Sequence, residues 1–428
     1  MIIIYSDTIS NRLIYTLDVI FKYVLGVDYR CTNKLQEFEA STLVRINYSK
    51  KNLDKTLQIT PSTLLFENGI RSQDIQVSWQ SEIPYFFRTG GEFLYDVFAS
   101  TFYMVSRYEE YLPFTSDIHG RFKAEDSLAF KQGFLKQPVV NLWSLELQHQ
   151  MVKLFPELCF PKKKTSYLNT LDIDIAYAYK SKGLVRFLGG FANSIIKKNK
   201  EEIVERISYL KSKKDPFDTY DFIENASKKI KTKYFFLLGN KAKYDPNIHF
   251  KRKGLKEIIL KLSKQHEIGI HPSYQSNQKP ALVAKEINRL TKILGKEITS
   301  SRQHFLKMSF PFTYENLIGQ KITKDYTMGF ASQVGFRAGI CNVYPFYNIE
   351  KEAQRPLWIV PFQVMDGTLN QYLSLTPTQA SQQLRALIDQ VRNVDGLFVS
   401  LWHNSSLSEK TIWMGWQKVY KDMLTLMK

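Results

Sequence analysis

The chain has 428 residues, of which 44% are hydrophobic and 23% charged, a globular composition that excludes extensive disorder. Its three cysteines, Cys31, Cys159 and Cys341, have no CxxC spacing, which argues against a disulfide framework or a cysteine-based zinc site. The net charge of +18 is uneven: residues 1–160 carry 16 basic and 18 acidic side chains, the remainder 43 and 23. An anionic partner or a solubilising surface would each explain the excess.

Residues 1–160 mix helical and strand patterns. Apolar spacing predicts helices over 11–25 and 93–112. Short strands separated by polar turns are expected over 43–49, 57–67 and 75–80. Pro161 and the three lysines after it mark a boundary. We therefore expect a smaller mixed α+β domain over 1–160, whose role the sequence does not indicate.

The first residues, from Met1 to Asp7, lack the basic segment of a signal peptide. No stretch approaches the apolar run of about 20 residues that spans a bilayer. These features predict a cytoplasmic protein.

From residue 165 strands alternate with helices. Strands are expected over 167–173, 234–239, 267–270, 298–301 and 397–401. One helix begins at Pro280 and ends at Gly295, and another is capped by Thr376. This alternation indicates parallel strands with crossover helices, in a barrel or an open sheet, and such folds bind ligands at the carboxyl ends of the strands.

Polar side chains stand at four of these strand ends. They are Asp172, Asp174, His271, Arg302, His304 and His403. Converging carboxylates and imidazoles are what a divalent metal with a general acid and base requires. Taken singly, a strand-end acid is often a cap and a histidine is usually structural, so the argument rests on their joint placement.

Five stretches of the second part resemble the polysaccharide deacetylase (NodB homology) family, carbohydrate esterase family 4. They are 170–174, 233–239, 266–273, Arg302 and 401–403. The whole chain resembles a bacterial subgroup in which an extra N-terminal domain precedes the deacetylase domain. The resemblance implies a distorted (β/α) barrel over 165–428, with an insertion near 180–215.

The family resemblance implies a metal-dependent hydrolase that removes an acetyl group from an amino sugar or a glycan precursor, in bacterial cell-surface glycan biosynthesis. Asp172 corresponds to the catalytic base, Arg302 to the arginine that orients it, and His403 to the acid. Aromatic side chains near these motifs are candidates for stacking on sugar rings. They are Tyr274, Phe305, Phe336 and Trp402.

The metal ligands are expected to be Asp174, His271 and a third group. The family's second histidine falls at Gln275 here, and an amide oxygen is a much weaker donor to zinc than an imidazole. His304 lies two residues after Arg302 on an extended segment and would point the same way. We predict that Asp174, His271 and His304 hold a divalent metal, with Zn²⁺ expected, and Gln275 is the alternative.

The expected partner is a carbohydrate, with an anionic or lipid-linked glycan as one candidate. Within the insertion, the apolar stretch 184–196 lies among lysines, a pattern that suits peripheral membrane contact or a helix covering the barrel. No zinc-finger, RNP-like or helix-turn-helix signature is found, so no nucleic acid is expected. The competing function is a catalytically degenerate deacetylase fold that only binds glycan.

Overall fold

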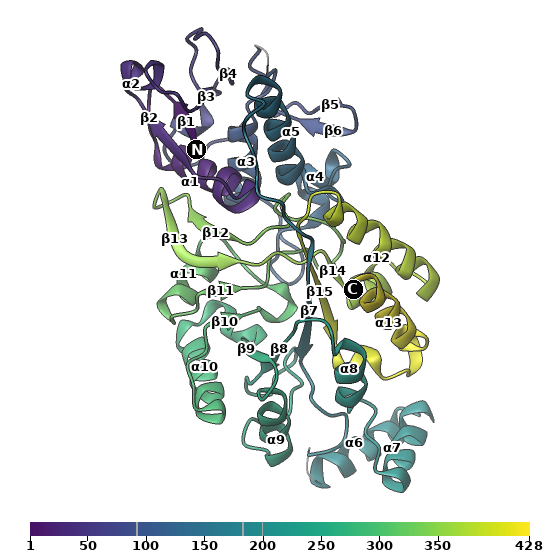
Figure 1. The fold of residues 1–428 in the computed structure, drawn as a ribbon. Helices are drawn as coiled ribbons and strands as arrows, with labels where there is room; N and C mark the ends of the chain where they lie inside the picture. The colour runs from purple at the N-terminus through teal and green to yellow at the C-terminus, as the bar shows by residue number, and fades with distance from the viewer. Residues whose placement is uncertain (91–92, 182–183, 199) are drawn as a thin grey trace.

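The computed structural model describes residues 1–90, 93–181, 184–198 and 200–428. Residues 182, 183 and 199 of the predicted insertion therefore lie outside the described residues. The protein is a mixed α/β structure built around two sheets that are mainly parallel (Figure 1).

The smaller sheet belongs to the N-terminal region, residues 1–160, and its strand order is β2-β1-β3-β4, all parallel. Its strands are β1 (Ile2–Tyr5), β2 (Tyr29–Thr32), β3 (Val44–Asn47) and β4 (Leu57–Gln58). A separate hairpin is formed by β5 (Ser78–Gln80) and β6 (Ile83–Tyr85). Among the described residues of this region, the α- and π-helices are α1 (Asn11–Leu17), its π-helical continuation (Asp18–Leu25), α2 (Leu35–Glu39), α3 (Val97–Val105), α4 (Leu128–Lys131) and α5 (Val139–Leu154).

Two predicted elements of this region differ from the structure. The strand expected over 57–67 ends at Gln58 and is followed by a 3-10 turn at Leu64–Phe66. The long helix expected over 93–112 is shorter, because the Asp96 side chain caps its start and Arg107 adopts a left-handed conformation with φ 55°. The apolar run of residues 93–112 therefore extends past both ends of α3.

The larger sheet has nine strands in the order β12-β13-β11-β10-β9-β8-β7-β15-β14. Every neighbouring pair is parallel except β12 and β13. In chain order the strands are β7 (Ser166–Ile173), β8 (Thr232–Leu237), β9 (Glu267–His271), β10 (Ser300–Ser301), β11 (Lys324–Asp325), β12 (Tyr344–Asn348), β13 (Ala353–Ile359), β14 (Val364–Met365) and β15 (Leu397–His403). The prediction of parallel strands is confirmed.

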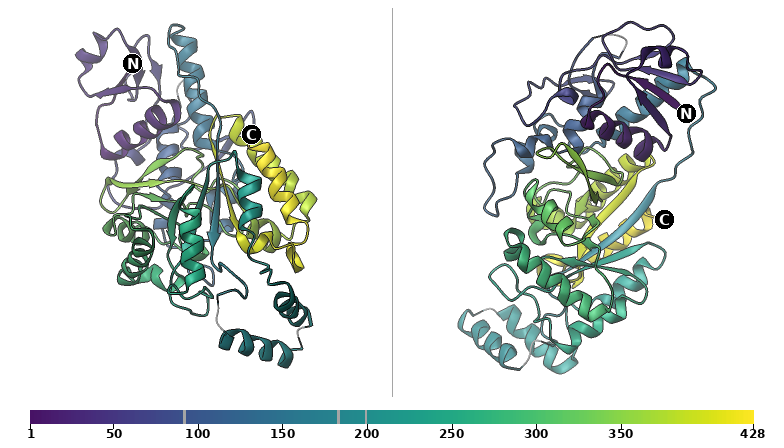
Figure 2. Two further views of the ribbon diagram at one scale, coloured as in Figure 1. Left: turned by 60° about the horizontal axis from the view of Figure 1, so that its bottom comes forward. Right: turned by 90° about the vertical axis from the view of Figure 1, so that its left-hand side faces the viewer.

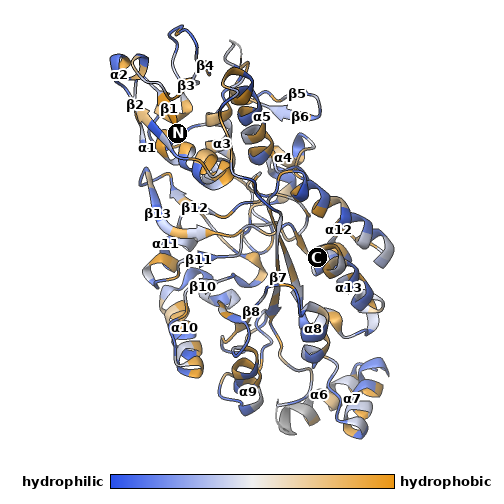
Figure 3. Ribbon diagram, viewed as in Figure 1, coloured by the Kyte–Doolittle hydropathy of each residue, from blue (hydrophilic) through white to orange (hydrophobic). Residues whose placement is uncertain are grey.

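Helices pack around this sheet (Figure 2). They are α8 (Tyr220–Ser227), α9 (Lys253–Leu262), α10 (Pro280–Leu294), α11 (Phe312–Gly319), α12 (Pro377–Arg392) and α13 (Trp416–Leu426). As predicted, Gly295 ends α10 in a left-handed conformation, and Thr376 forms a capping box at the start of α12. Hydropathy follows the packing: the apolar side of α12 is buried and its polar side faces outward (Figure 3).

The two regions share one apolar core and a buried ionic contact. Glu110 accepts hydrogen bonds from Arg107 Nε at 2.8 Å and Arg337 Nε at 2.9 Å. Burial raises the pKa of Glu110, but Arg337 and Arg107 lower it more, to below its usual value. The segment around Arg337 is thus held against the N-terminal region.

The insertion forms two helices, α6 (Leu184–Ile196) and α7 (Lys200–Ser212). They contact each other and stand out from the body of the molecule (Figure 2). Among the described residues, no helix combines the length and apolar character needed to cross a membrane.

Candidate active site and metal centre

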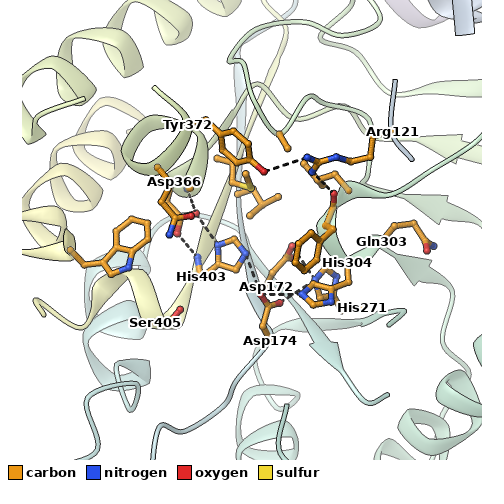
Figure 4. A pocket seen from close by; sticks show the side chains of 18 residues that line it. Arg121, Asp172, Asp174, His271, Gln303, His304, Asp366, Tyr372, His403 and Ser405 are labelled. Carbon is orange, nitrogen blue, oxygen red and sulfur yellow. Dashed lines mark hydrogen bonds and ion pairs between the residues drawn. The ribbon is translucent and has the colours of Figure 1, made fainter. Parts of the chain in front are cut away.

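A cavity of about 260 Å³ lies at the carboxyl ends of β7, β9, β10 and β15 (Figure 4). The sheet sets its geometry, because Asp172 on β7 and His403 on β15 are directly paired in register. Asp174 follows β7, and His271 ends β9. The cavity therefore occupies the edge of the sheet at which ligands gather in parallel α/β folds.

Three side chains surround one point in this cavity. Ligand atoms of Asp174, His271 and His304 all lie within 4.8 Å of one another. His271 Nε2 is 3.2 Å from Asp174 Oδ1, and His304 Nε2 is 3.4 Å from Asp174 Oδ2. We call these three residues the Asp-His-His cluster.

The other ring nitrogen of each histidine is already engaged. His271 Nδ1 donates to the backbone carbonyl of Arg302 at 2.6 Å, and since a carbonyl only accepts, the proton is on Nδ1. His304 Nδ1 is 2.9 Å from Asp245 Oδ1, on a carboxylate that is fully buried. Such partners orient the Nε2 lone pairs of metal-binding histidines.

The cluster fits a bound cation. The Nε2 atoms of two imidazoles face one carboxylate, and Asp174 Oδ1 is buried without a hydrogen-bond donor among the described residues. Burial raises the pKa of Asp174, but His304 and His403 lower it well below its usual value. Burial lowers the pKa of His304, whereas Asp174 and Asp245 raise it to about 9. A positive charge is thus strongly favoured between these groups.

Asp172 lies beside the cluster and is held by Arg302. Arg302 is fully buried, and its Nη1 donates to Asp172 Oδ1 at 2.9 Å while its Nε donates to the Tyr326 carbonyl. Asp172 Oδ2 is 3.7 Å from His271 Nε2. Arg302 therefore fixes one oxygen of Asp172 and leaves the other facing the cluster.

His403 completes the group from the opposite side (Figure 4). Its Nδ1 is 2.8 Å from Asp366 Oδ1, its backbone N–H donates to Asp366 Oδ2, and its Nε2 is 3.7 Å from Asp174 Oδ2. Burial lowers the pKa of His403, but Asp366 and Asp174 raise it, to about 10. Both carboxylates therefore favour the protonated form of the ring.

The third position of the cluster is occupied by His304. Gln275 is exposed, lies in a 3-10 turn after β9, and does not line the cavity. His304 lines it and reaches Asp174. Whether these side chains bind metal stays a prediction.

The four predicted stacking residues do not all reach the cavity. Phe305 lines it, and Tyr274 packs on Phe305 with ring centroids 5.2 Å apart. Trp402 and Phe336 are buried, at 0% and 1% exposure. Trp402 follows Leu401 and precedes His403 on β15, and because side chains alternate along a strand it points to the opposite face, onto Trp416 of α13.

Several groups in or next to the cavity were not predicted from the sequence, and three of them contact the predicted residues. Asp245 and Asp366 orient His304 and His403, and Arg121 comes from the N-terminal region. Asp366 directly follows the short strand β14, and this position at a strand end is the sequence feature that could have identified it. Asp245 and Arg121 lie in loops with no regular pattern.

Comparison with known proteins gives three findings. Residues 2–156 match a family of unknown function (DUF7033). No curated protein matches. Among solved structures, the chain is similar to a "putative polysaccharide deacetylase from Mycobacterium smegmatis", with 14% identity and a TM-score of 0.38, over 62% of this chain and 86% of that one. The residues of the cavity, rather than this likeness, indicate the function.

Proposed function

We propose that the protein is a metal-dependent carbohydrate deacetylase that hydrolyses the amide of an acetylated amino sugar or glycan precursor. One observation carries the proposal: the Asp-His-His cluster has an arginine-held carboxylate on one side and a histidine held by Asp366 on the other. Acyl hydrolysis requires a base to activate water and an acid to protonate the leaving amine. The cavity offers a group for each role.

Asp172 is the proposed base. Arg302 holds its Oδ1, so Oδ2 is directed at the cluster and can take the proton of the attacking water. As water adds to the acyl carbon, that proton passes to Asp172. Arg302 acts through Asp172 and is a positioning residue.

His403 is the proposed acid. Asp366 holds its Nδ1, which directs Nε2 toward the cluster, and the raised pKa favours the protonated form of the ring. When the carbon–nitrogen bond breaks, the Nε2 proton goes to the amine, which would otherwise be a poor leaving group. Acetate and a free amino sugar are the products.

Asp174, His271 and His304 are the proposed metal ligands. One carboxylate and two imidazoles form a donor set that suits catalytic Zn²⁺, the ion we propose. When bound, such an ion supplies Lewis acidity toward water and the acyl carbonyl.

Acetate release by metal-loaded protein tests this function. Protein reconstituted with Zn²⁺ should bind about one ion per chain and release acetate from N-acetylglucosamine oligomers. Asp174→Ala should lose both properties, whereas Asp389→Ala, at an exposed aspartate of α12, should keep both. Oligomer binding without acetate release by the loaded parent would support the glycan-binding alternative instead.

We also propose that the α6–α7 pair contacts an anionic membrane, which would suit a lipid-linked glycan. Apolar side chains on the pair are exposed, among them Ile196 at 79% and Val204 at 64%. Residues 180–215 carry ten basic and four acidic side chains, and a basic amphipathic surface suits a bilayer interface. The pair follows Asp174 closely in the chain, so it leaves the sheet at the edge that holds the cavity.

For the architecture, we propose two domains, 1–160 and 165–428, with the second a distorted (β/α) barrel of the deacetylase type. The nine-stranded sheet has two edge strands, β12 and β14. Because no pairing between them closes the sheet among the described residues, it fits a barrel only in distorted form.

A further inference from the structure

A tight turn of the N-terminal region carries Arg121 to the cavity. The Asp117 carbonyl accepts from Gly120 N–H at 2.9 Å, and Asp117 N–H donates to the Arg121 carbonyl at 2.9 Å. Asp117 Oδ1 also accepts from the backbone N–H groups of His119 and Arg121, at 2.8 and 2.9 Å. Gly120 has φ +77°, which favours glycine. The turn is thus fixed by its own hydrogen bonds.

Arg121 joins this turn to the rest of the cavity wall. Its Nε donates to Asp117 Oδ2 at 2.7 Å, its Nη1 to the Phe305 carbonyl at 2.8 Å, and its Nη2 to the Tyr372 hydroxyl at 3.4 Å. Figure 4 shows Arg121 and Tyr372 facing each other across the cavity from the histidines. Because Asp117 pairs with the guanidinium charge, Arg121 suits a neutral hydroxyl or amide oxygen better than an anion.

A second cavity of about 480 Å³ adjoins the first one. Both are lined by Arg121, Leu306, Ala331 and Tyr372. The second cavity lies between residues 116–125 and residues 329–332. It mixes apolar groups such as Phe122 and Phe330 with Ser332 and with charged side chains, among them Lys123, Glu125 and Arg337. Apolar faces with a few polar groups are what a sugar ring requires.

We propose that the N-terminal region completes the substrate cleft. Its residues 116–125 form one wall of a second subsite, which takes the sugar next to the acetylated one. Arg121, at the junction, is the specificity-determining residue. The substrate class is therefore an oligosaccharide with at least two sugar units. This inference rests on the proposed function, and it gives the segment matched by the family of unknown function a part in the site.

Activity against substrates of increasing length tests the second subsite. The probes are N-acetylglucosamine and its β-1,4-linked dimer and tetramer. The parent's kcat/KM should be about tenfold higher or more for the dimer than for the monomer, the gain expected from one or two further hydrogen bonds. Ser332→Trp, which fills the second cavity from its wall, should reduce this dimer-to-monomer ratio to near one. Tyr372→Phe should reduce it less, because only the hydroxyl is removed.

The matched control is Ser381→Trp, which lines a separate cavity beside α12 and α13 and should keep the parent's ratio. Calorimetric binding of the tetramer is a second readout that does not need catalysis. If the parent hydrolyses monomer and dimer equally well, or Ser332→Trp leaves the ratio unchanged, the second subsite is wrong and the deacetylase function stands. If no probe is hydrolysed but the parent binds tetramer about tenfold more tightly than Ser332→Trp, the deacetylase function fails and the subsite stands. Absence of both activity and binding overturns both.

Discussion

The two sides of the proposed active-site cavity are built in different ways. On one side, Asp172 and His403 sit on paired strands, so hydrogen-bonded register fixes their separation. On the other, Arg121 sits in a turn and is positioned by its own side-chain contacts. Reacting groups have to be placed within about 0.5 Å, which strands achieve better than loops. Loops tolerate change, and are suited to choosing substrates.

Substitution of the proposed base, Asp172, should have the largest effect, and it separates the chemical step from substrate specificity. Asp172→Asn keeps the side-chain volume and the contact with Arg302 but removes the proton acceptor. Acetate release should fall by about 10²- to 10⁴-fold, by the same factor for every substrate length, with the metal content unchanged. A length-dependent loss, or an active variant, would show that Asp172 is not the base.

The contact between the two regions can be broken at Glu110. Glu110→Gln leaves Arg337 buried without its anionic partner, and loss of one member of a buried pair destabilises a protein by about 3–5 kcal/mol. Urea unfolding followed by fluorescence measures this. Asp422→Asn removes an exposed pair with Lys418 and should cost less than about 1 kcal/mol. Equal effects of the two substitutions would contradict a stabilising role for the buried contact.

The described residues of the α6–α7 pair do not line the cavity. Substitutions in the pair are therefore expected to change membrane binding and not the hydrolysis of soluble substrates. Reversing the charges of Lys197, Lys198 and Lys200 should weaken binding to phosphatidylserine vesicles by about 100-fold, since each lysine near an anionic surface contributes about 1 kcal/mol. Acetate release from soluble oligomers should not change.

The matched control reverses Lys228, Lys229 and Lys231, which are exposed just before β8 at the opposite edge of the sheet. Equal vesicle binding by the parent and the α6–α7 variant would rule out the membrane contact.

The smallest effect is expected for Asp245, the hydrogen-bond partner of the proposed metal ligand His304. Asp245→Asn should lower the Zn²⁺ affinity by about 10- to 100-fold, because the hydrogen bond that orients His304 is weakened. Glu286→Gln is the control: this buried carboxylate accepts from Ser273 and does not contact the Asp-His-His cluster. Competition with a chromogenic chelator gives both affinities. An unchanged affinity in Asp245→Asn would remove His304 from the proposed ligands.

Local sequence determined the alternation of strands and helices and much of the cavity's chemistry. The strand with Asp172 at its end, the helix limits at Gly295 and Thr376, and the choice of His304 over Gln275 all follow from neighbours a few residues apart. Strand alternation and capping are short-range effects, so the sequence alone expresses them. The same alternation points Trp402 to the opposite face of β15 from His403. The prediction that Trp402 stacks on a sugar ring did not take this alternation into account.

Only the tertiary structure decided which groups support these residues. Asp366 is 37 positions from His403, Asp245 is 59 positions from His304, and Arg121 is 184 positions from the Phe305 carbonyl. No periodicity connects such pairs. Their contacts exist because the chain folds back on itself and because buried polar groups must find partners. The reacting side chains are therefore readable from the strands that carry them, whereas their orientation and the second cavity depend on how distant segments pack together.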